Sequence, residues 1–391
     1  MKISIISDAH LGFGLGTERE GDAFAAFSEA VNKALVSDAI LMAGDIFDSR
    51  TPPAEIFSRA LEIFSRPVTA GRNGAKITEG IGKDVSAISP IARLGIPVVA
   101  IYGTHERRSR GLVNPIESLE KAGFLIKLHH STLVLEKAGQ KVAVSGLSGV
   151  PDQYAKTVLE EWNPKPVPGA FNILMVHQTF SEFIYAPDAV PVSILPKGFD
   201  LYVCGHIHER RQTELYGKPL LVAGSLVSTQ LKPTGKGVWV KEEPKGIWEV
   251  EMHDGGAAIK WLLLENQREI YYGTFSSAEE AGEKIKELTS RAGFKPIARI
   301  TLPEDADAGG LEMRFGERAV ISVKKAKKKE QPQTVSIEQQ KMSVQEMGRK
   351  ILEENLKKAG LEPRLFVEFF ELLAEGKTEE ASALIDNRKP A

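Results

Sequence analysis

Five short apolar runs, each followed by aspartate or histidine, constrain this chain more than any other feature. The runs are residues 3–6, 40–43, 98–101, 173–176 and 201–204. The side chains that follow them are, in order, Asp8 and His10, Asp45 and Asp48, His105, His177, and His206 and His208. Short apolar runs bounded by Gly and Pro are typical of buried strands, and ligands of open α/β sheets gather beyond the carboxyl ends of such strands. The pattern therefore predicts a polynuclear metal site at one sheet edge.

Up to about residue 250 these runs alternate with amphipathic helical stretches, which is the pattern of an α/β fold. We expect helices at 22–36 and 53–64, and a surface loop at the glycine-containing, polar stretch 69–86. The turn signal at 254–256 predicts a hairpin between strands at 248–251 and 259–262. This hairpin would supply the outer strands of the first domain's sheet.

A second, smaller mixed domain follows. Ser277 and Glu280 have the capping-box spacing at the start of a helix that Gly293 would end, and strands are expected at 297–302 and 319–323. The lysine-rich residues 324–329 then indicate a charged linker, with nucleic-acid contact as the alternative. We expect a nuclease-type domain at 1–265, a cap domain at 266–323, a linker at 324–342 and a helical segment at 343–391.

The C-terminal segment has two amphipathic helical patterns. Apolar residues recur at helical spacing after Ser343, and a second set follows Pro363. Segments this short rarely bury so much apolar surface alone, and contiguous exposed apolar surface marks an interface. We expect a protein partner to bind here, with docking back onto this chain as the alternative.

Composition limits the classes of protein that fit. The formal net charge of −2 and the pI of about 6.5 argue against a chain that is basic overall, so any nucleic-acid contact must come from a local patch. Cys204 is the only cysteine, which excludes an intrachain disulfide. The N-terminal apolar run is too short for a signal peptide, and no run approaches the ~18 apolar residues of a membrane span. We expect a soluble cytoplasmic protein with no membrane association.

Taken together, these ligand types predict phosphoester hydrolysis. Carboxylates and imidazoles suit Mn²⁺, Fe or Zn²⁺ better than a thiolate site would. Two such ions held ~3.5–4 Å apart clamp the attacking and leaving oxygens of a phosphoryl displacement. Asp45 is the natural candidate for a carboxylate that bridges both ions.

The ligands lie in five motifs that resemble those of the calcineurin-like metallophosphoesterases. The motifs are Asp8-Ala9-His10, Gly44-Asp45-Ile46-Phe47-Asp48, Gly103-Thr104-His105-Glu106, His177 and Gly205-His206-Ile207-His208. More narrowly, the chain is similar to the archaeal DNA double-strand-break repair nucleases, which are related to bacterial SbcD. The similarity lies in residues 7–12, the form of the second motif, the small following domain and the helical tail. This resemblance implies an α/β fold: a two-sheet metallophosphoesterase sandwich flanked by helices, a small α+β DNA-capping domain and a C-terminal helical tail.

The resemblance also implies a role for each motif residue. One metal ion would be held by Asp8, His10, Asp45 and His208. A second would share Asp45 and be held by Thr104, His177 and His206. His105 would be the catalytic histidine that protonates the leaving sugar oxygen, and Asp48 would orient an imidazole ligand. The expected cofactor is two Mn²⁺ ions per subunit, with Mg²⁺, Fe or Zn²⁺ as alternatives.

Position 104 departs from the family pattern. The usual motif has asparagine there, whereas this chain has Thr104, whose hydroxyl stays close to the backbone. The second ion would then be bound through water, bound more weakly, or helped by a neighbour such as Glu106. We expect activity that is retained but needs more metal, and complete loss of the second ion is the rival outcome.

Substrate is indicated by arginines beside the motifs. They are Arg107, Arg108, Arg110, Arg210 and Arg211. Such residues suit a polyanion, because phosphate contacts position nucleic acid without reading its sequence. Ordinary surface charge is the alternative for each one singly. Because the chain is close to neutral, tight DNA binding would need a partner or a dimer.

The resemblance implies a Mn²⁺-dependent DNA nuclease of the 3′-5′ exonuclease and single-stranded DNA endonuclease type, which processes double-strand breaks. It would act on double- and single-stranded DNA ends as a homodimer, in a complex with an SMC-like coiled-coil ATPase, in the nucleoid-associated cytoplasm. The ATPase would bind residues 343–391 around Leu352, Phe366, Phe369 and Phe370. The two other hypotheses are a phosphatase or phosphodiesterase of small esters and a non-catalytic scaffold.

Overall fold

The structure is a computed structural model. It describes residues 1–71, 74–109, 111–229, 239–253, 256–288, 293–306 and 309–326, together with Leu356. The described residues up to 326 belong to one compact unit.

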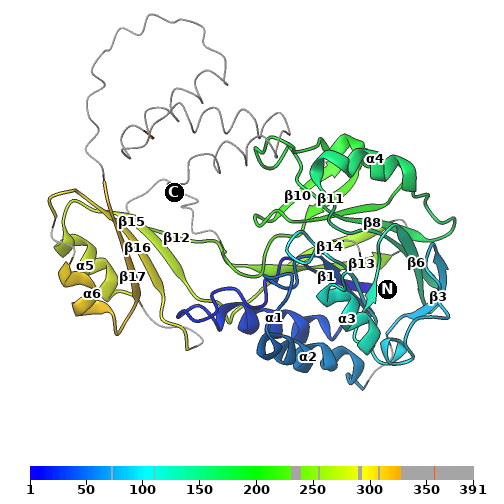
Figure 1. The fold of residues 1–391 in the computed structure, drawn as a ribbon, viewed down its shortest axis with the longest axis horizontal. Helices are drawn as coiled ribbons and strands as arrows, with labels where there is room; N and C mark the ends of the chain where they lie inside the picture. Colours follow the sequence, from blue (N-terminus) through cyan, green and yellow to red (C-terminus); the bar gives the residue numbers. More distant parts are fainter. Residues whose placement is uncertain are drawn as a thin grey trace, which may run out of the picture. The chain divides into compact units, whose positions relative to one another are not determined.

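Two sheets packed face to face form the centre of this unit (Figure 1). The six-stranded sheet has the order β14-β13-β1-β2-β4-β5, in which β1, β2, β4 and β5 are parallel neighbours. Its strands are β1 (Lys2–Ile6), β2 (Ala39–Ala43), β4 (Val98–Ile101), β5 (Ile126–Lys127), β13 (Gly246–His253) and β14 (Gly256–Leu263). The predicted hairpin is confirmed, since β13 and β14 pair antiparallel at the edge of this sheet.

The second sheet has seven strands in the order β10-β11-β9-β8-β7-β6-β3. They are β3 (Lys76–Ile81), β6 (Ser131–Lys137), β7 (Gln140–Leu147), β8 (Phe171–His177), β9 (Leu201–Gly205), β10 (Arg211–Leu215) and β11 (Lys218–Val222). Its inner strands β7, β8, β9 and β11 are parallel. Consequently the carboxyl ends of β8 and β9 lie next to each other.

Both faces of the inner strands are buried, which explains why the runs are apolar without alternation. On β2, Ile40 and Met42 pack on the helix side, whereas Leu41 and Ala43 pack between the sheets. Helices cover the outer faces, with α1 (Asp22–Ala34), α2 (Ala54–Val68) and α3 (Pro115–Ala122) on the six-stranded sheet and α4 (Asp152–Trp162) on the other. Short 3₁₀ turns lie at η1 (Ile91–Arg93) and η2 (Val192–Ile194). The expected sandwich flanked by helices is confirmed.

The expected loop at 69–86 is wrong in part, because β3 lies within it and pairs antiparallel with β6. This strand is at the sheet edge, and most of its side chains are exposed or half-buried. Its stability comes from backbone hydrogen bonds to one neighbour, so its sequence has no apolar pattern to reveal it. The helix expected at 53–64 also continues one turn further, to Val68.

A four-stranded sheet, β12-β15-β16-β17, follows with two helices on it. Its elements are β12 (Trp239–Lys241), β15 (Ile270–Thr274), α5 (Ala278–Lys286), β16 (Ile297–Leu302), α6 (Gly309–Phe315) and β17 (Val320–Lys325). Ser277 caps α5 by accepting from the backbone N–H of Glu280, which is one half of the predicted capping box. The other half differs, because the Glu280 carboxylate accepts from Ser276 and not from Ser277. The helix ends before the predicted stop at Gly293. Strand β12 comes from before residue 266, and the predicted domain boundaries stay a prediction.

A buried ion pair ties the small sheet to the start of α1. The Arg268 guanidinium donates to both carboxylate oxygens of Asp22, at 2.9 and 3.1 Å, and to the carbonyls of Glu18 and Lys295. Arg19 adds a 3.0 Å contact to the same carboxylate. Both Arg268 and Asp22 are buried, so the position of the small sheet depends on this pair.

Replacing Arg268 with methionine should lower the free energy of unfolding by about 1.5–3 kcal/mol, because the buried Asp22 carboxylate loses its hydrogen bonds from Arg268 and keeps only that from Arg19. Urea denaturation followed by fluorescence measures the loss. Arg318→Met is the matched control, since Arg318 is exposed and makes one side-chain bond at 3.2 Å, to the Lys286 carbonyl. Equal midpoints for both variants would contradict the role given to Arg268.

Candidate metal centre

The predicted ligands meet where strands of both sheets end. Asp8 and His10 follow β1, and Asp45 follows β2. His177 ends β8, and His206 follows β9. Backbone hydrogen bonds of 3.0 Å from Asp8 N–H to the Gly44 carbonyl and from His10 N–H to the Asp45 carbonyl join the first two loops. The parallel strand order therefore brings side chains from distant parts of the sequence to one edge.

Four of these residues have left-handed backbone. The φ angles are 50° at Asp8, 48° at His10, 47° at Asp45 and 78° at His206. Left-handed φ is uncommon outside glycine, although Asp and His adopt it more readily than most residues. Such strain persists only where the surroundings hold it and is concentrated at functional sites.

Gly44 makes room for the site. Its φ is +96°, and a Cβ there would lie 2.4 Å from the His177 Nδ1 atom. No larger residue fits between β2 and Asp45 without moving His177. The glycine of this motif is thus required by close packing against the imidazole.

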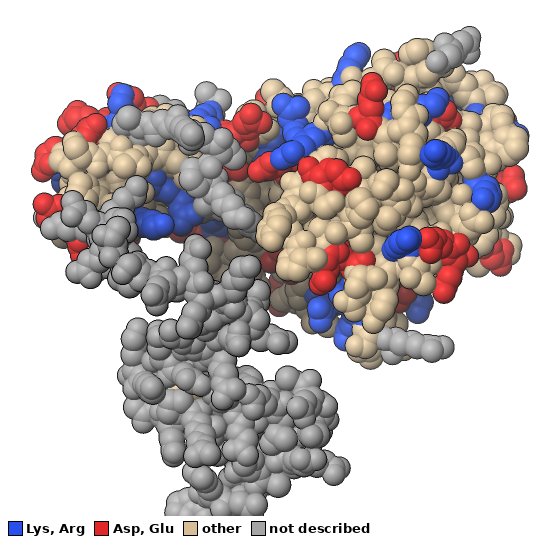
Figure 2. Space-filling model, turned by 90° about the horizontal axis from the view of Figure 1, so that it is seen from above, with Lys and Arg blue, Asp and Glu red and all other residues tan. Residues whose placement is uncertain are grey.

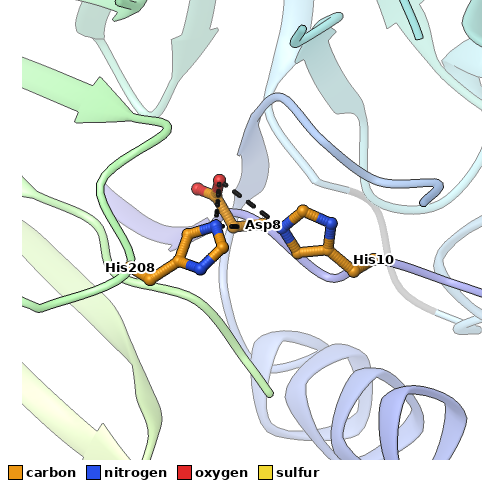
Figure 3. Close-up of side chains that lie close together, drawn as sticks. All are labelled: Asp8, His10 and His208. Carbon is orange, nitrogen blue, oxygen red and sulfur yellow. Dashed lines mark hydrogen bonds and ion pairs between the residues drawn. The ribbon is translucent and has the colours of Figure 1, made fainter. Parts of the chain in front are cut away.

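Asp8, His10 and His208 form the first group of ligand atoms (Figure 3). The Nε2 atoms of His10 and His208 are 3.1 Å apart. Asp8 Oδ1 lies 3.9 Å from the first and 3.7 Å from the second. The three side chains point toward one another, Asp8 and His10 from the loop after β1 and His208 from the loop between β9 and β10.

These atoms have the arrangement that a cation requires. His10 Nδ1 is 3.0 Å from Asp48 Oδ1, and His208 Nδ1 is 2.9 Å from the Thr229 hydroxyl. When both imidazoles are neutral and donate through Nδ1, each has its lone pair on Nε2, and the two lone pairs then face each other across 3.1 Å. Asp8 Oδ1 beside them is buried with no hydrogen-bond partner among the described residues. A divalent cation satisfies all three atoms.

Asp45, His177 and His206 form the second group. His177 Nδ1 donates to the Ala43 carbonyl at 2.7 Å, which leaves Nε2 to face Asp45 Oδ2 at 3.1 Å. His206 Nδ1 is buried without a hydrogen-bond partner in the described part of the chain. This group also fits a metal ion.

Burial and neighbouring charges shift the imidazole pKa values in different directions. Burial lowers the pKa of His206 to about 4 and that of His208 to about 3, so both rings are neutral at pH 7. Burial also acts to lower the pKa of His177, but Asp45 outweighs it and raises this pKa to about 9. A cation at the second group would therefore displace a proton from His177.

Thr104 and Glu106 differ in what they offer the second group. The Thr104 hydroxyl donates to Asp45 Oδ2 at 3.2 Å, so it lies beside the ligands. The Glu106 carboxylate accepts from the backbone N–H groups of Phe47 and Gly103, both at 2.8 Å. Glu106 is fully buried, and burial raises its pKa to about 8. Both of its oxygens thus accept from the loops that carry the ligands, and Glu106 is in none of the ligand groups of the described residues. Its help to a second ion, one of three alternatives, stays a prediction.

His105 and Asp48 lie at the mouth of the first group. His105 Nδ1 donates to the Asp48 carbonyl at 3.0 Å, and its backbone N–H donates to Asp45 Oδ1 at 2.8 Å. The ring packs edge-on against His10 with centroids 4.8 Å apart. The His105 side chain is 42% exposed. Its Nε2 edge is thus the one free to meet a substrate, while Asp48 orients both histidines.

The four described arginines that are expected to contact DNA have different local surroundings. Arg210 lies over the Trp261 ring at 5.1 Å, and Arg211 pairs with Glu209 at 3.0 Å. Arg108 donates to the Val113 carbonyl at 3.4 Å, and Arg107 is half-buried. On the face that Figure 2 shows, Lys and Arg side chains lie among Asp and Glu side chains. Arg110 lies outside the described residues, and the DNA-contact role of all five stays a prediction.

Sequence reasoning missed Thr229, which fixes the His208 ring. Nothing in its sequence surroundings distinguishes it, because the contact crosses 21 positions. Ser7, which donates to Asp8 Oδ2, had one signal: it directly precedes a ligand.

The predicted partner-binding residues Leu352, Phe366, Phe369 and Phe370 lie outside the described residues. In the part of the chain that is described, no helix combines the length and apolar character needed to span a membrane.

Comparisons with known proteins agree with the geometry. Residues 1–210 match the Calcineurin-like phosphoesterase family. The chain is 25% identical over 356 residues to the DNA double-strand break repair protein Mre11 of Methanopyrus kandleri, covering 82% of this chain and 72% of that protein. It is 30% identical over 230 residues to the protein of that name from Sulfurisphaera tokodaii, covering 56% of this chain and 52% of the relative.

The double-strand break repair protein MRE11 of Homo sapiens is 25% identical over 378 residues, covering 82% of this chain and 53% of the relative. The chain thus spans about half the length of the second and third relatives. The resemblance predicted from the five motifs is confirmed by these matches.

Thr229→Val should weaken metal binding at the first group by about 10- to 100-fold, because the His208 ring loses the partner that orients it. Calorimetric titration of the metal-free protein with Mn²⁺ measures this. Thr213→Val, on the exposed strand β10, is the matched control. Unchanged affinity in Thr229→Val would show that packing alone holds the ring.

Proposed function

Because the chain belongs to the calcineurin-like phosphoesterase family, we propose that it is a Mn²⁺-dependent DNA nuclease that processes double-strand breaks. The observation that carries this proposal is the pair of ligand groups, Asp8, His10 and His208 beside Asp45, His177 and His206. The proposed substrate, DNA, comes from the names of the three relatives described above, which are double-strand break repair proteins.

Two divalent cations at such a site act as Lewis acids toward phosphoryl oxygens and lower the pKa of water toward 7. Asp8, His10 and His208 would hold one of them, and His177 and His206 the other, with Asp45 shared. Mn²⁺ suits this set of carboxylate and imidazole ligands, and Mg²⁺, Fe or Zn²⁺ are alternatives.

The chain's own residues then do the positioning and proton transfer. His105 has its Nδ1–H held by the Asp48 carbonyl at 3.0 Å, which leaves Nε2 for the substrate. A protonated Nε2 would donate to the leaving sugar oxygen, as a general acid does within hydrogen-bond reach. The 2.8 Å bond from the His105 backbone N–H to Asp45 Oδ1 keeps this histidine at a constant distance from the metal ligands.

The wider assembly is proposed from the resemblance. The nuclease domain, residues 1–265, would act as a 3′-5′ exonuclease and single-stranded DNA endonuclease, with 266–323 as the DNA-capping domain. Beyond the linker at 324–342, residues 343–391 would bind an SMC-like coiled-coil ATPase, and the nuclease would work as a homodimer in the nucleoid-associated cytoplasm. The formal net charge of −2 supports a need for such partners in DNA binding.

Wild-type protein should cleave end-labelled linear duplex DNA with Mn²⁺ and not with EDTA, and His105→Ala should lower the rate by about 10²–10⁴-fold. Gel analysis of the products measures both. His253→Ala, a histidine at the end of β13 on the opposite edge of the sheet, is the control that should keep full activity. Hydrolysis of a small ester such as bis-p-nitrophenyl phosphate, without Mn²⁺-dependent DNA cleavage, would favour a phosphodiesterase of small esters instead.

Thr104→Asn should reduce the Mn²⁺ concentration for half-maximal activity by about tenfold, because an amide oxygen reaches the second ion while the threonine hydroxyl is taken up by Asp45. Activity against Mn²⁺ concentration gives the shift, and Thr104→Ser should behave as wild type. Calorimetry distinguishes weak binding of the second ion from its complete loss in the wild type. If the stoichiometry is one ion in the wild type and two in Thr104→Asn, the wild type binds no second ion.

A further inference from the structure

An apolar loop tip stands beside the metal centre. The chain leaves β8 at His177, forms a loop over residues 181–190 and enters η2. At its tip Tyr185 is 100% exposed and Ile184 is 43% exposed. A tyrosine with its whole side chain in solvent contributes nothing to the packing of the fold.

Hydrogen bonds fix the base of this loop, whereas the side chains at its tip are exposed to solvent. Ser181 N–H donates to the Val190 carbonyl at 3.0 Å, and Val190 N–H donates to the Thr179 carbonyl at 3.1 Å. Phe180 at the start of the loop is fully buried. The Asp152 carboxylate accepts from Thr179 N–H at 3.1 Å. These bonds fix where the tip is presented.

Chain order and one contact relate the loop to the metal ligands. The loop begins four residues after His177, whose ring lies in the second ligand group at the carboxyl end of β8. The Arg211 guanidinium lies 5.9 Å from the centre of the Phe183 ring, and Arg211 is three residues after His208. The base of the loop therefore lies at the end of the strands where the metal ligands gather.

The chemistry of the tip suits a nucleobase better than a protein. One exposed aromatic ring and one aliphatic side chain match the face of a single base, whereas a stable protein interface buries ~800 Å² on each partner. Bases stack on aromatic side chains regardless of sequence, and apolar wedges inserted beside bases unstack duplexes. Arg211 is already paired with Glu209 at 3.0 Å, so the attraction would come from stacking and not from charge.

We propose that Ile184 and Tyr185 form a binding site for the terminal base of a DNA duplex and hold it unpaired, so that one strand can enter the metal centre. This proposal rests on the proposed nuclease function. It assigns to the loop the separation of strands at a DNA end, while the metal ligands and His105 carry out cleavage.

The test compares two DNA ends that differ only in pairing. Tyr185→Ala should cleave a blunt, fully paired duplex about tenfold more slowly than wild type. A duplex whose last three pairs are mismatched should be cleaved by both proteins at rates within about twofold, since its end is already open. Tyr185→Phe keeps the ring and should behave as wild type on both substrates.

Val36→Ala is the control variant. Val36 is also an exposed apolar residue, at 59%, but it lies between α1 and the start of β2, at the edge of the sheet opposite the metal ligands. It should leave both rates unchanged. Equal losses on paired and mismatched ends in Tyr185→Ala would overturn the proposal, because they would indicate a general effect on the site.

A binding measurement complements the rates. A 2-aminopurine at the terminal position should become brighter when wild-type protein binds the paired end with Ca²⁺ in place of Mn²⁺, and this rise should be absent with Tyr185→Ala. If Tyr185→Ala keeps the rise but loses binding to a partner protein such as the repair ATPase, the tip is a protein contact and the proposal is wrong. If wild type cleaves no DNA of either kind, the proposed function fails; if it cleaves both and Tyr185→Ala matches it, only the loop assignment fails.

Discussion

The contact between the Asp45 carboxylate and the His177 imidazole is the interaction on which the rest of the metal centre depends. The carboxylate comes from the six-stranded sheet, faces His177 from the seven-stranded sheet at 3.1 Å, and accepts from the His105 backbone N–H at 2.8 Å. Burial raises the cost of its charge, but His177 more than offsets this and holds the pKa of Asp45 below its usual range. One buried carboxylate therefore contacts a strand end of the second sheet and the backbone of His105 at the same time.

The layers of the fold could be predicted from sequence because their cause is local. The runs at 40–43 and 201–204 are apolar without alternation, and this pattern arises only where both faces of a strand are covered. Because parallel strands end at one edge, the order of Asp and His after each run also predicted which side chains would meet. His208 and Asp8 lie 3.7 Å apart although 200 positions separate them.

The parts of the structure that the sequence did not predict are held by contacts that produce no periodicity or spacing in the sequence. Strand β3 is held by the backbone of β6, which any side chains permit. Thr229 was missed because a single hydroxyl near a distant imidazole has no periodicity or spacing. The motif did not reveal that both oxygens of Glu106 accept backbone N–H groups of the loops that carry the ligands. A motif gives a residue's neighbourhood but not the direction of its side chain.

The left-handed backbone at Asp8, His10 and Asp45 affects how mutants of this site are interpreted. Aspartate and histidine tolerate this conformation better than alanine does, so an alanine substitution removes a ligand and also strains the loop. Loss of activity in an alanine scan would then combine two causes. Asparagine at positions 8 and 45 keeps the backbone preference while removing the charge, and it is the substitution that isolates the contribution of the ligand.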